Sequence, residues 1–158
     1  MKLFSKIIAI GAIILLVVAC TKGNIKKEEY IHLVDKLEQS DKFLTTFPFN
    51  IEVKLTRILD DEVSYKVIID KKDNNLKQIK AIAIHNMKTT DIYPSIGIFD
   101  KPIDLLVNQD KKGIILVGYI KTKKDIKDLE LEIKVYVEFI NDEGKLIKNM
   151  YKYQNMTK

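Results

Sequence analysis

The stretch LELEIKVYVEFI at residues 129–140 decides the fold, because apolar and polar side chains alternate along most of it. Successive side chains of a β-strand point to opposite faces, so this spacing predicts a strand with one apolar and one largely charged face. The apolar face is expected to lie in the core and consists of Leu131, Ile133, Val135, Val137 and Phe139. The opposite face, which includes Lys134, is expected to face solvent and to be open to a partner.

Neighbouring segments predict further strands. The turn letters NDEG at 141–144 and the run KLIKNMYKY after them complete an antiparallel hairpin over 129–153. Residues 51–56 and 63–69 repeat the period of two. Two other runs, IKAIAI at 79–84 and IILVGYI at 114–120, are apolar on both faces. Such runs fit central strands that are covered on both sides, or partly so.

One helix precedes the strands. Tyr30, Leu33, Val34 and Leu37 follow the spacing of a single helical face, which predicts a helix from about 26 to 39 that packs against the core. Asn24 is a possible N-cap. No second amphipathic helix separates the strands, so we expect an all-β fold of six to eight strands. Its form is an antiparallel β-sandwich of immunoglobulin-like architecture, preceded by one short N-terminal helix.

The only cysteine of the 158 residues lies in LLVVACTKG at 15–23. Before it, Lys2 and Lys6 give a basic start, and every residue from Ile7 to Ala19 is apolar or Gly. As a helix this run spans roughly 20 Å, which is short of the ~30 Å hydrocarbon core of a bilayer. The pattern predicts a secretory signal peptide. A plain signal peptide without lipid attachment, or a transmembrane anchor, is the alternative.

The ending Val17-Val18-Ala19-Cys20 resembles the lipobox of bacterial lipoproteins. The resemblance implies that residues 1–19 are removed as a lipoprotein signal peptide and that the Cys20 sulfur carries a diacylglycerol. Two acyl chains hold a protein stably on a membrane, so we expect a lipid-anchored protein of the cell membrane that faces outside the cytoplasm. Residues 20–26 would form a tether, and 27–158 one ectodomain.

Parts of the ectodomain, among them FPFNIEVKL at 47–55 and DIYPSIGIFD at 91–100, are similar to small lipoproteins of unassigned function from AT-rich bacteria. That resemblance implies a β-rich surface domain and brings no catalytic residues.

Few residues offer chemistry. His85, with Asp91 and Ser95 after it, is the one arrangement that could support general base catalysis, but the serine lacks a nucleophile-elbow context. Two histidines without a free cysteine are too few for a zinc site. Asp60–Glu62 and Asp70–Asn75 lack the Gly and closing Glu of a calcium loop and indicate turns. We therefore expect no enzymatic activity, metal or cofactor.

The basic residues do not indicate a nucleic-acid reader. The net charge is +5, yet Arg57 is the only arginine, whereas sequence-specific readers rely heavily on arginine. Two binding candidates remain. The first is the loop 121–128, which contains Lys121, Lys123, Lys124 and Lys127. The second is the segment 91–102, whose apolar residues could serve either core packing or an exposed contact.

These features favour a non-catalytic binding or adaptor module of the bacterial cell envelope. Its partners would be the membrane, through the lipid on Cys20, and an envelope protein or polymer. A structural or assembly factor of a membrane complex, with the helix as docking element, is the first alternative. An envelope hydrolase is the second.

Overall fold

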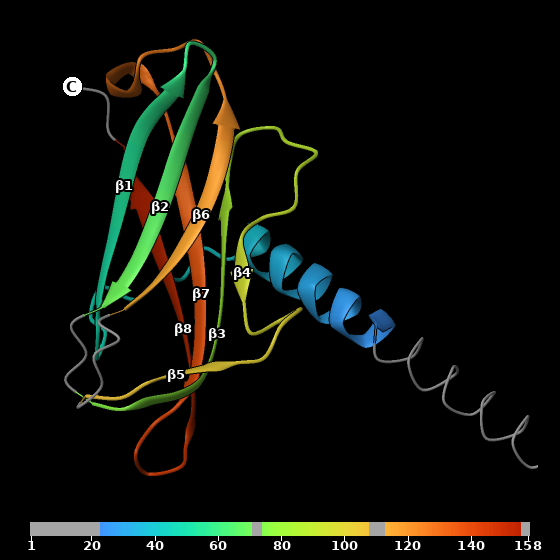
Figure 1. The fold of residues 1–158 in the computed structure, drawn as a ribbon, viewed down its shortest axis with the longest axis vertical. Coiled ribbons are helices and arrows are strands. Elements are labelled where there is room, and N and C mark those ends of the chain that lie inside the picture. The colour runs from blue at the N-terminus through green and yellow to red at the C-terminus, as the bar shows by residue number, and fades with distance from the viewer. Residues whose placement is uncertain (1–22, 71–73, 108–112, 156–158) are drawn as a thin grey trace, which may run out of the picture.

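The computed structural model describes residues 23–70, 74–107 and 113–155, and within them eight strands form two antiparallel sheets (Figure 1). Cys20 and the segment 1–19 lie outside the described residues. The first sheet has the order β1-β2-β6, with β1 at Asn50–Leu59, β2 at Glu62–Asp70 and β6 at Gly113–Lys121. The second has the order β4-β3-β7-β8, with β4 at Ser95–Ile96, β3 at Leu76–His85, β7 at Glu132–Ile140 and β8 at Leu146–Gln154; β5 at Ile103–Leu105 also pairs with β3.

The main core lies between the two sheets. All five residues of the predicted apolar face of 129–140 are buried in it, so the alternation is confirmed. They face the inward side chains of β2, which are Val63, Tyr65, Val67 and Ile69. The predicted hairpin is also confirmed, since β7 and β8 pair antiparallel from Glu132↔Gln154 to Ile140↔Leu146. Over the described residues the fold is thus mostly strands in two antiparallel sheets, as in an all-β sandwich, with one α-helix.

Strand β3 is covered on both faces, as its apolar run predicts. Ala81 and Ala83 lie in the core between the sheets. Ile82 and Ile84, on the other face, belong to a second buried cluster with the helix residues Leu33 and Leu37. The small side chains on the inner face leave room for Tyr65, whose hydroxyl donates to the Ala83 carbonyl at 3.3 Å.

The central position expected for 114–120 is wrong. These residues form β6, which lies at the edge of the three-stranded sheet. Its even-numbered residues are buried, whereas Ile115, Val117 and Tyr119 are 52%, 39% and 50% exposed. The reason is that the only α-helix in the described part of the chain covers the other sheet. The run is half covered, and its second apolar face is open.

The N-terminal helix (residues 23–39) lies across the outer face of the five-stranded sheet, and its N-terminal end projects away from the strands (Figure 1). It already includes residues 23–25, so it begins earlier than the predicted position 26, and Asn24 lies inside it rather than at a cap. Residues 23–26 of the expected tether are therefore helical. None of the helices in the described ranges has the length and hydropathy needed to cross a membrane.

The outer face of β7 is not the free charged surface that the alternation suggests. The Lys134 amine donates to the carbonyls of Glu38 and Ser40, at 3.0 and 3.2 Å, just where the helix ends. Tyr136 is buried beneath the helix, and its hydroxyl donates to the Glu138 carboxylate at 2.6 Å. The expectation that this face remains for a partner is corrected, because the helix occupies it.

Candidate binding cleft around His85

The site is built where β3 ends. The chain leaves the sheet at Asn86, whose backbone N–H donates to the Glu132 carbonyl at 3.1 Å. Its side chain accepts from the Glu132 N–H at 3.0 Å and donates to the Glu130 carbonyl at 3.3 Å. These bonds satisfy the backbone at the start of β7 and place His85 at the last position of the strand.

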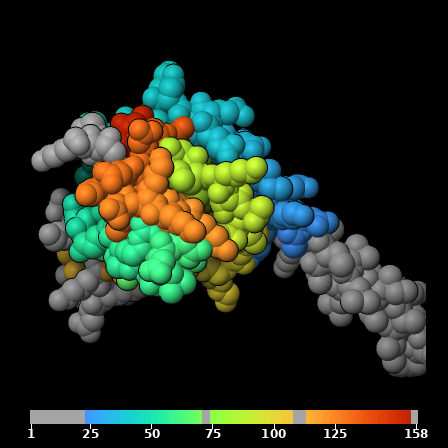
Figure 2. All heavy atoms as spheres, turned by 90° about the horizontal axis from the view of Figure 1, so that it is seen from above, coloured from blue at the N-terminus to red at the C-terminus, as the bar shows by residue number. Residues whose placement is uncertain are grey.

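The segment after Asn86 loops out and returns to the helix. Its end is held by Tyr93, whose N–H donates to the Tyr30 hydroxyl at 2.8 Å and whose own hydroxyl donates to the His85 carbonyl at 3.4 Å. The Pro94 carbonyl then accepts from the Ala83 N–H at 3.1 Å. Seen from above, the yellow-green residues of this part of the chain lie between the orange of β6 and the blue helix (Figure 2).

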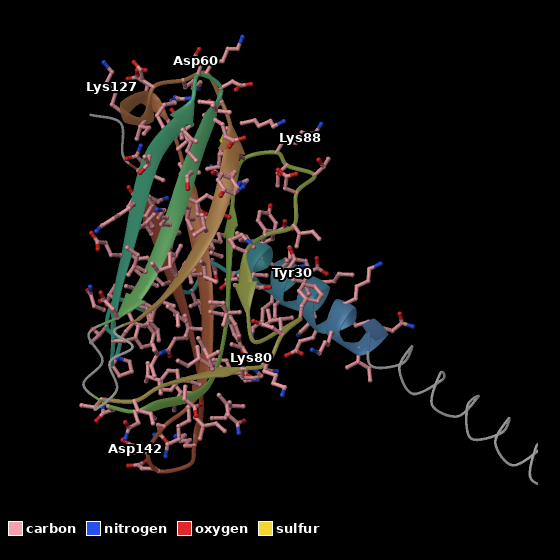
Figure 3. All side chains as sticks on the ribbon, in the orientation of Figure 1. Tyr30, Asp60, Lys80, Lys88, Lys127 and Asp142 are labelled. Atoms are coloured by element: carbon pink, nitrogen blue, oxygen red, sulfur yellow. The ribbon has the colours of Figure 1, made fainter. Side chains whose placement is uncertain are left out.

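A cavity of about 370 Å³ opens between the loop, the C-terminal end of the helix and the start of β7. It takes its walls from three segments that are far apart in the sequence, namely the end of the helix, residues 84–93 and the start of β7. Its lining includes both apolar and charged side chains: Glu38, Ile84, His85, Asn86, Met87, Lys88, Thr89, Tyr93, Glu132 and Lys134. Figure 3 shows Lys88 on the loop that borders it. We call this cavity the His85 cleft.

His85 is the residue that connects the cleft to its surroundings. It also lines two smaller cavities of about 220 and 180 Å³, which lie between the loop and β6. Its side chain is only 7% exposed and lies edge-on to the rings of Tyr65 and Tyr93, with ring centres 5.4 and 5.2 Å away. Its Nδ1 is buried and has no hydrogen-bond partner within the described residues.

Burial determines the charge state of His85. Loss of water contact lowers the pKa of the imidazole, and the backbone carbonyls of Met87 and Tyr119 oppose part of that shift. The ring is therefore neutral at pH 7, with one nitrogen that donates and one that accepts. A neutral imidazole beside Ile84 and Met87 suits a ligand group that carries one hydrogen bond and some apolar surface.

Charged groups surround the cleft on two sides. Lys134 lies 3.7 Å from the Glu132 carboxylate, which is also 3.5 Å from Lys152. Lys88 is exposed on the loop side. The lining thus combines a neutral ring with charges of both signs. This arrangement can orient a polar segment without favouring one net charge.

The expected arrangement of His85, Asp91 and Ser95 is only partly present. Asp91 lines both smaller cavities with His85, and its carboxylate favours the charged ring weakly. Ser95 lies on β4 opposite Ile82 and lines none of these three cavities. Thr89 lines all three cavities beside His85.

The lysine loop at 121–128 lies at the same end of the sandwich as the cleft (Figure 3), and its first residue, Lys121, lines the cavity of about 220 Å³ with His85. It contains a short 3₁₀ helix, Ile126–Asp128, and is held by Arg57, whose guanidinium donates to the carbonyls of Thr122 (2.6 Å) and Lys124. All four of its lysines are exposed. The single arginine therefore has a structural role, and the loop presents its lysines to solvent.

The segment 91–102 divides between the two expected roles. Ile98 is buried under the helix and Ile96 packs against the main core. Ile92 and Phe99 are exposed.

Asp60–Glu62 forms the turn between β1 and β2. In the described ranges no three His, Cys, Asp or Glu side chains gather as a metal site would require, and part of Asp70–Asn75 lies outside those ranges.

No protein-family model matches the chain, and no curated protein matches it.

The cleft was not evident from the sequence, since Glu38, Lys88 and Lys134 carry no shared motif. One local signal exists: the apolar run of β3 ends abruptly in Ile84-His85-Asn86, which places two polar side chains at the end of a buried strand.

Proposed function

We propose that the protein is a lipid-anchored, non-catalytic binding module of the bacterial cell envelope, held on the membrane through Cys20 and exposed outside the cytoplasm. The observation that carries the binding role is the His85 cleft, a cavity of about 370 Å³ whose lining includes the buried imidazole of His85. The lipobox and the signal-like segment before it support the anchoring. The sandwich would display the cleft, in the manner of immunoglobulin-like domains, by analogy of architecture.

The proposed ligand is a segment of an envelope protein. A peptide offers carbonyl and amide groups for His85 and Asn86, apolar side chains for Met87 and Tyr93, and charges for the mixed rim. A uniformly acidic wall polymer would meet Glu38 and Glu132 at the same rim. The charge pattern therefore favours a protein segment over such a polymer.

An assembly role in a membrane complex is the second candidate, and β6 favours it. Ile115, Val117 and Tyr119 form an exposed apolar stripe on an edge strand that has no charged residue before Lys121. Edge strands of this kind readily pair with other chains. The helix offers less for docking, because its apolar face is already buried on its own sheet.

Site-specific photo-crosslinking in intact membranes tests the binding role. A crosslinker at Lys88, on the rim of the cleft, is expected to capture a discrete envelope protein, and replacing His85 by Ala should abolish that product. A crosslinker at Val117 reports on the assembly alternative, and one at Lys145 in the β7–β8 turn is the control. Equal labelling from Lys88 and Lys145 would reject the cleft as the binding site.

The anchoring is tested separately by mass spectrometry of the mature N-terminus. We expect a diacylglycerol-modified Cys20 as the first residue. A Cys20→Ala protein should accumulate with residues 1–19 attached. An unmodified Cys20 or an intact Met1 would refute the lipid anchor.

A further inference from the structure

Two exposed apolar side chains lie on the segments that come together near the N-terminal end of the helix. Ile25 is 61% exposed on the helix, and Phe99 is 46% exposed on the loop before β5. The two segments are joined here, since the Lys26 amine donates to the Phe99 carbonyl at 2.6 Å and the Tyr30 and Phe99 ring centres are 5.1 Å apart. The helix and the loop that carry these two side chains are thus held together at this end of the domain.

Basic side chains border this pair. Lys27 follows Lys26 in the helix, Lys101 follows Phe99 by two residues in the loop, and both are exposed. The nearby acids are largely engaged within the protein. The Glu29 carboxylate pairs with Lys80 at 2.5 Å, and the Asp100 carboxylate accepts from the Gly97 N–H at 2.5 Å. Glu28 and Asp100 are exposed, and of the two only Asp100 has its carboxylate bonded within the described residues. We call Ile25, Lys26, Lys27, Phe99 and Lys101 the proximal patch.

The helix that carries the patch is fixed to the sandwich. Leu33 and Leu37 are buried in the cluster on the outer face of β3 and β7. Lys80 bridges Glu29 and Glu138, at 2.5 and 3.8 Å, and is labelled beneath the helix in Figure 3. The far end is tied by the bonds from Lys134. The helix therefore cannot swing freely about the domain, and its N-terminal end has one position relative to both sheets.

The length of chain before the helix limits where this end can lie. Only residues 21 and 22 separate Cys20 from Gly23, the first described helical residue. Even a fully extended chain reaches about 3.3–3.6 Å per residue, so Gly23 lies within roughly 11 Å of the lipidated residue. Because the anchor sits at the bilayer surface, the helix N-terminus must sit there as well.

We propose that the proximal patch contacts the bilayer and fixes the orientation of the domain. This inference rests on the proposed lipid anchor at Cys20. Ile25 and Phe99 would enter the headgroup region, where apolar side chains gain burial, and the lysines would contact anionic lipid headgroups. The His85 cleft, at the other end of a helix of roughly 25 Å, would then be held away from the membrane and open to a partner.

The absence of tryptophan from the chain allows a direct test. Full-length protein is expressed, processed in cells, extracted and reconstituted into phosphatidylcholine–phosphatidylglycerol vesicles with brominated acyl chains, which quench nearby tryptophan. Phe99→Trp and Ile25→Trp place single probes in the proximal patch. Leu59→Trp, an exposed apolar position at the β1–β2 turn, is the matched control. Both patch probes should lose most of their emission, and the control should keep it.

Replacing Lys27 and Lys101 together by Ala should lower the ratio of docked to undocked domain by about fivefold per lysine in anionic vesicles. The same double change should have little effect in pure phosphatidylcholine. Quenching that is equal at Phe99→Trp and Leu59→Trp, in protein that floats with the vesicles, would overturn the fixed orientation and leave the anchor intact. Protein that does not float with the vesicles and has an unmodified Cys20 would refute both the lipid anchor and the fixed orientation.

Discussion

Strands β3 and β6 have similar sequences and different surroundings. Both contain a run that is apolar on successive residues, IKAIAI and IILVGYI. In β3 both faces are buried, one against the facing sheet and one against the N-terminal helix. In β6 one face is buried and the other is exposed at Ile115, Val117 and Tyr119.

This difference shows that an apolar run indicates how much surface a strand can bury, but not which element will cover it. The chain supplies one helix in its described part, and that helix lies across β3 and β7. The uncovered face of β6 must therefore remain in water or meet another chain. Matched substitutions on the two strands measure this difference.

The largest effect is expected from the same substitution at two positions. Ile82→Ala on β3 removes a side chain that is fully buried under the helix, and should lower the free energy of unfolding by about 2–5 kcal/mol. Ile115→Ala on β6 should change it by less than ~0.5 kcal/mol, since the residue is exposed. Urea denaturation of both variants, with the chain starting at residue 21, makes the comparison. Similar losses would mean that the helix does not cover β3.

The buried face of β6 should be sensitive where its outer face is not. A Cβ at Gly118 would lie 2.3–2.5 Å from the ring of Tyr65, so Gly118→Ala forces that ring to move. We expect a loss of about 1–3 kcal/mol in the free energy of unfolding. Gly23→Ala is the control, because a Cβ there meets nothing within 4 Å. An unchanged urea midpoint for Gly118→Ala would show that the ring of Tyr65, on the neighbouring strand β2, leaves room for a side chain at position 118.

Replacing a lysine on the helix-covered outer face of β7 should cost more stability than replacing one on the outer face of β2. Lys134→Met removes the donors to the Glu38 and Ser40 carbonyls and should cost about 1 kcal/mol. Lys66→Met, on the outer face of β2 beside Val117, should cost less than ~0.5 kcal/mol. Thermal melts suffice for this pair. Equal midpoints would indicate that the helix end is not held by Lys134.

The smallest effect is a pH dependence from His85. Burial holds its folded-state pKa below the ordinary value of 6.5, so the unfolded chain binds a proton at a higher pH than the folded protein. Stability is therefore full above pH 6.5 and falls as the pH decreases from there toward the folded pKa. His85→Phe keeps a ring between Tyr65 and Tyr93 and should flatten this part of the stability–pH curve. A curve that keeps its slope in His85→Phe would assign the dependence to other groups.

Local alternation predicted the strands well. Strands β2 and β7 each bury one face in the main core, and the positions of their apolar residues indicate which face that is. The helix face was equally predictable from Tyr30 to Leu37. The pattern could not indicate which strand the helix would cover, since that depends on contacts between residues some fifty positions apart, such as Glu29 and Lys80. The same holds for Lys134, which looks like a surface residue until the helix end is placed beside it. The His85 cleft is formed by three separate segments of the chain, and none of them indicates it alone.

A double-mutant cycle tests the central claim, that the helix buries the outer face of β3, most directly. The free energy of unfolding is measured for Leu37→Ala alone, with Ile82→Ala and with Ile115→Ala. Leu37 and Ile82 share one buried cluster, so their combined loss should differ from the sum of the single losses by about 0.5–3 kcal/mol. Leu37 and Ile115 should add to within roughly 0.5 kcal/mol. Additive losses for Leu37 and Ile82 would contradict the account.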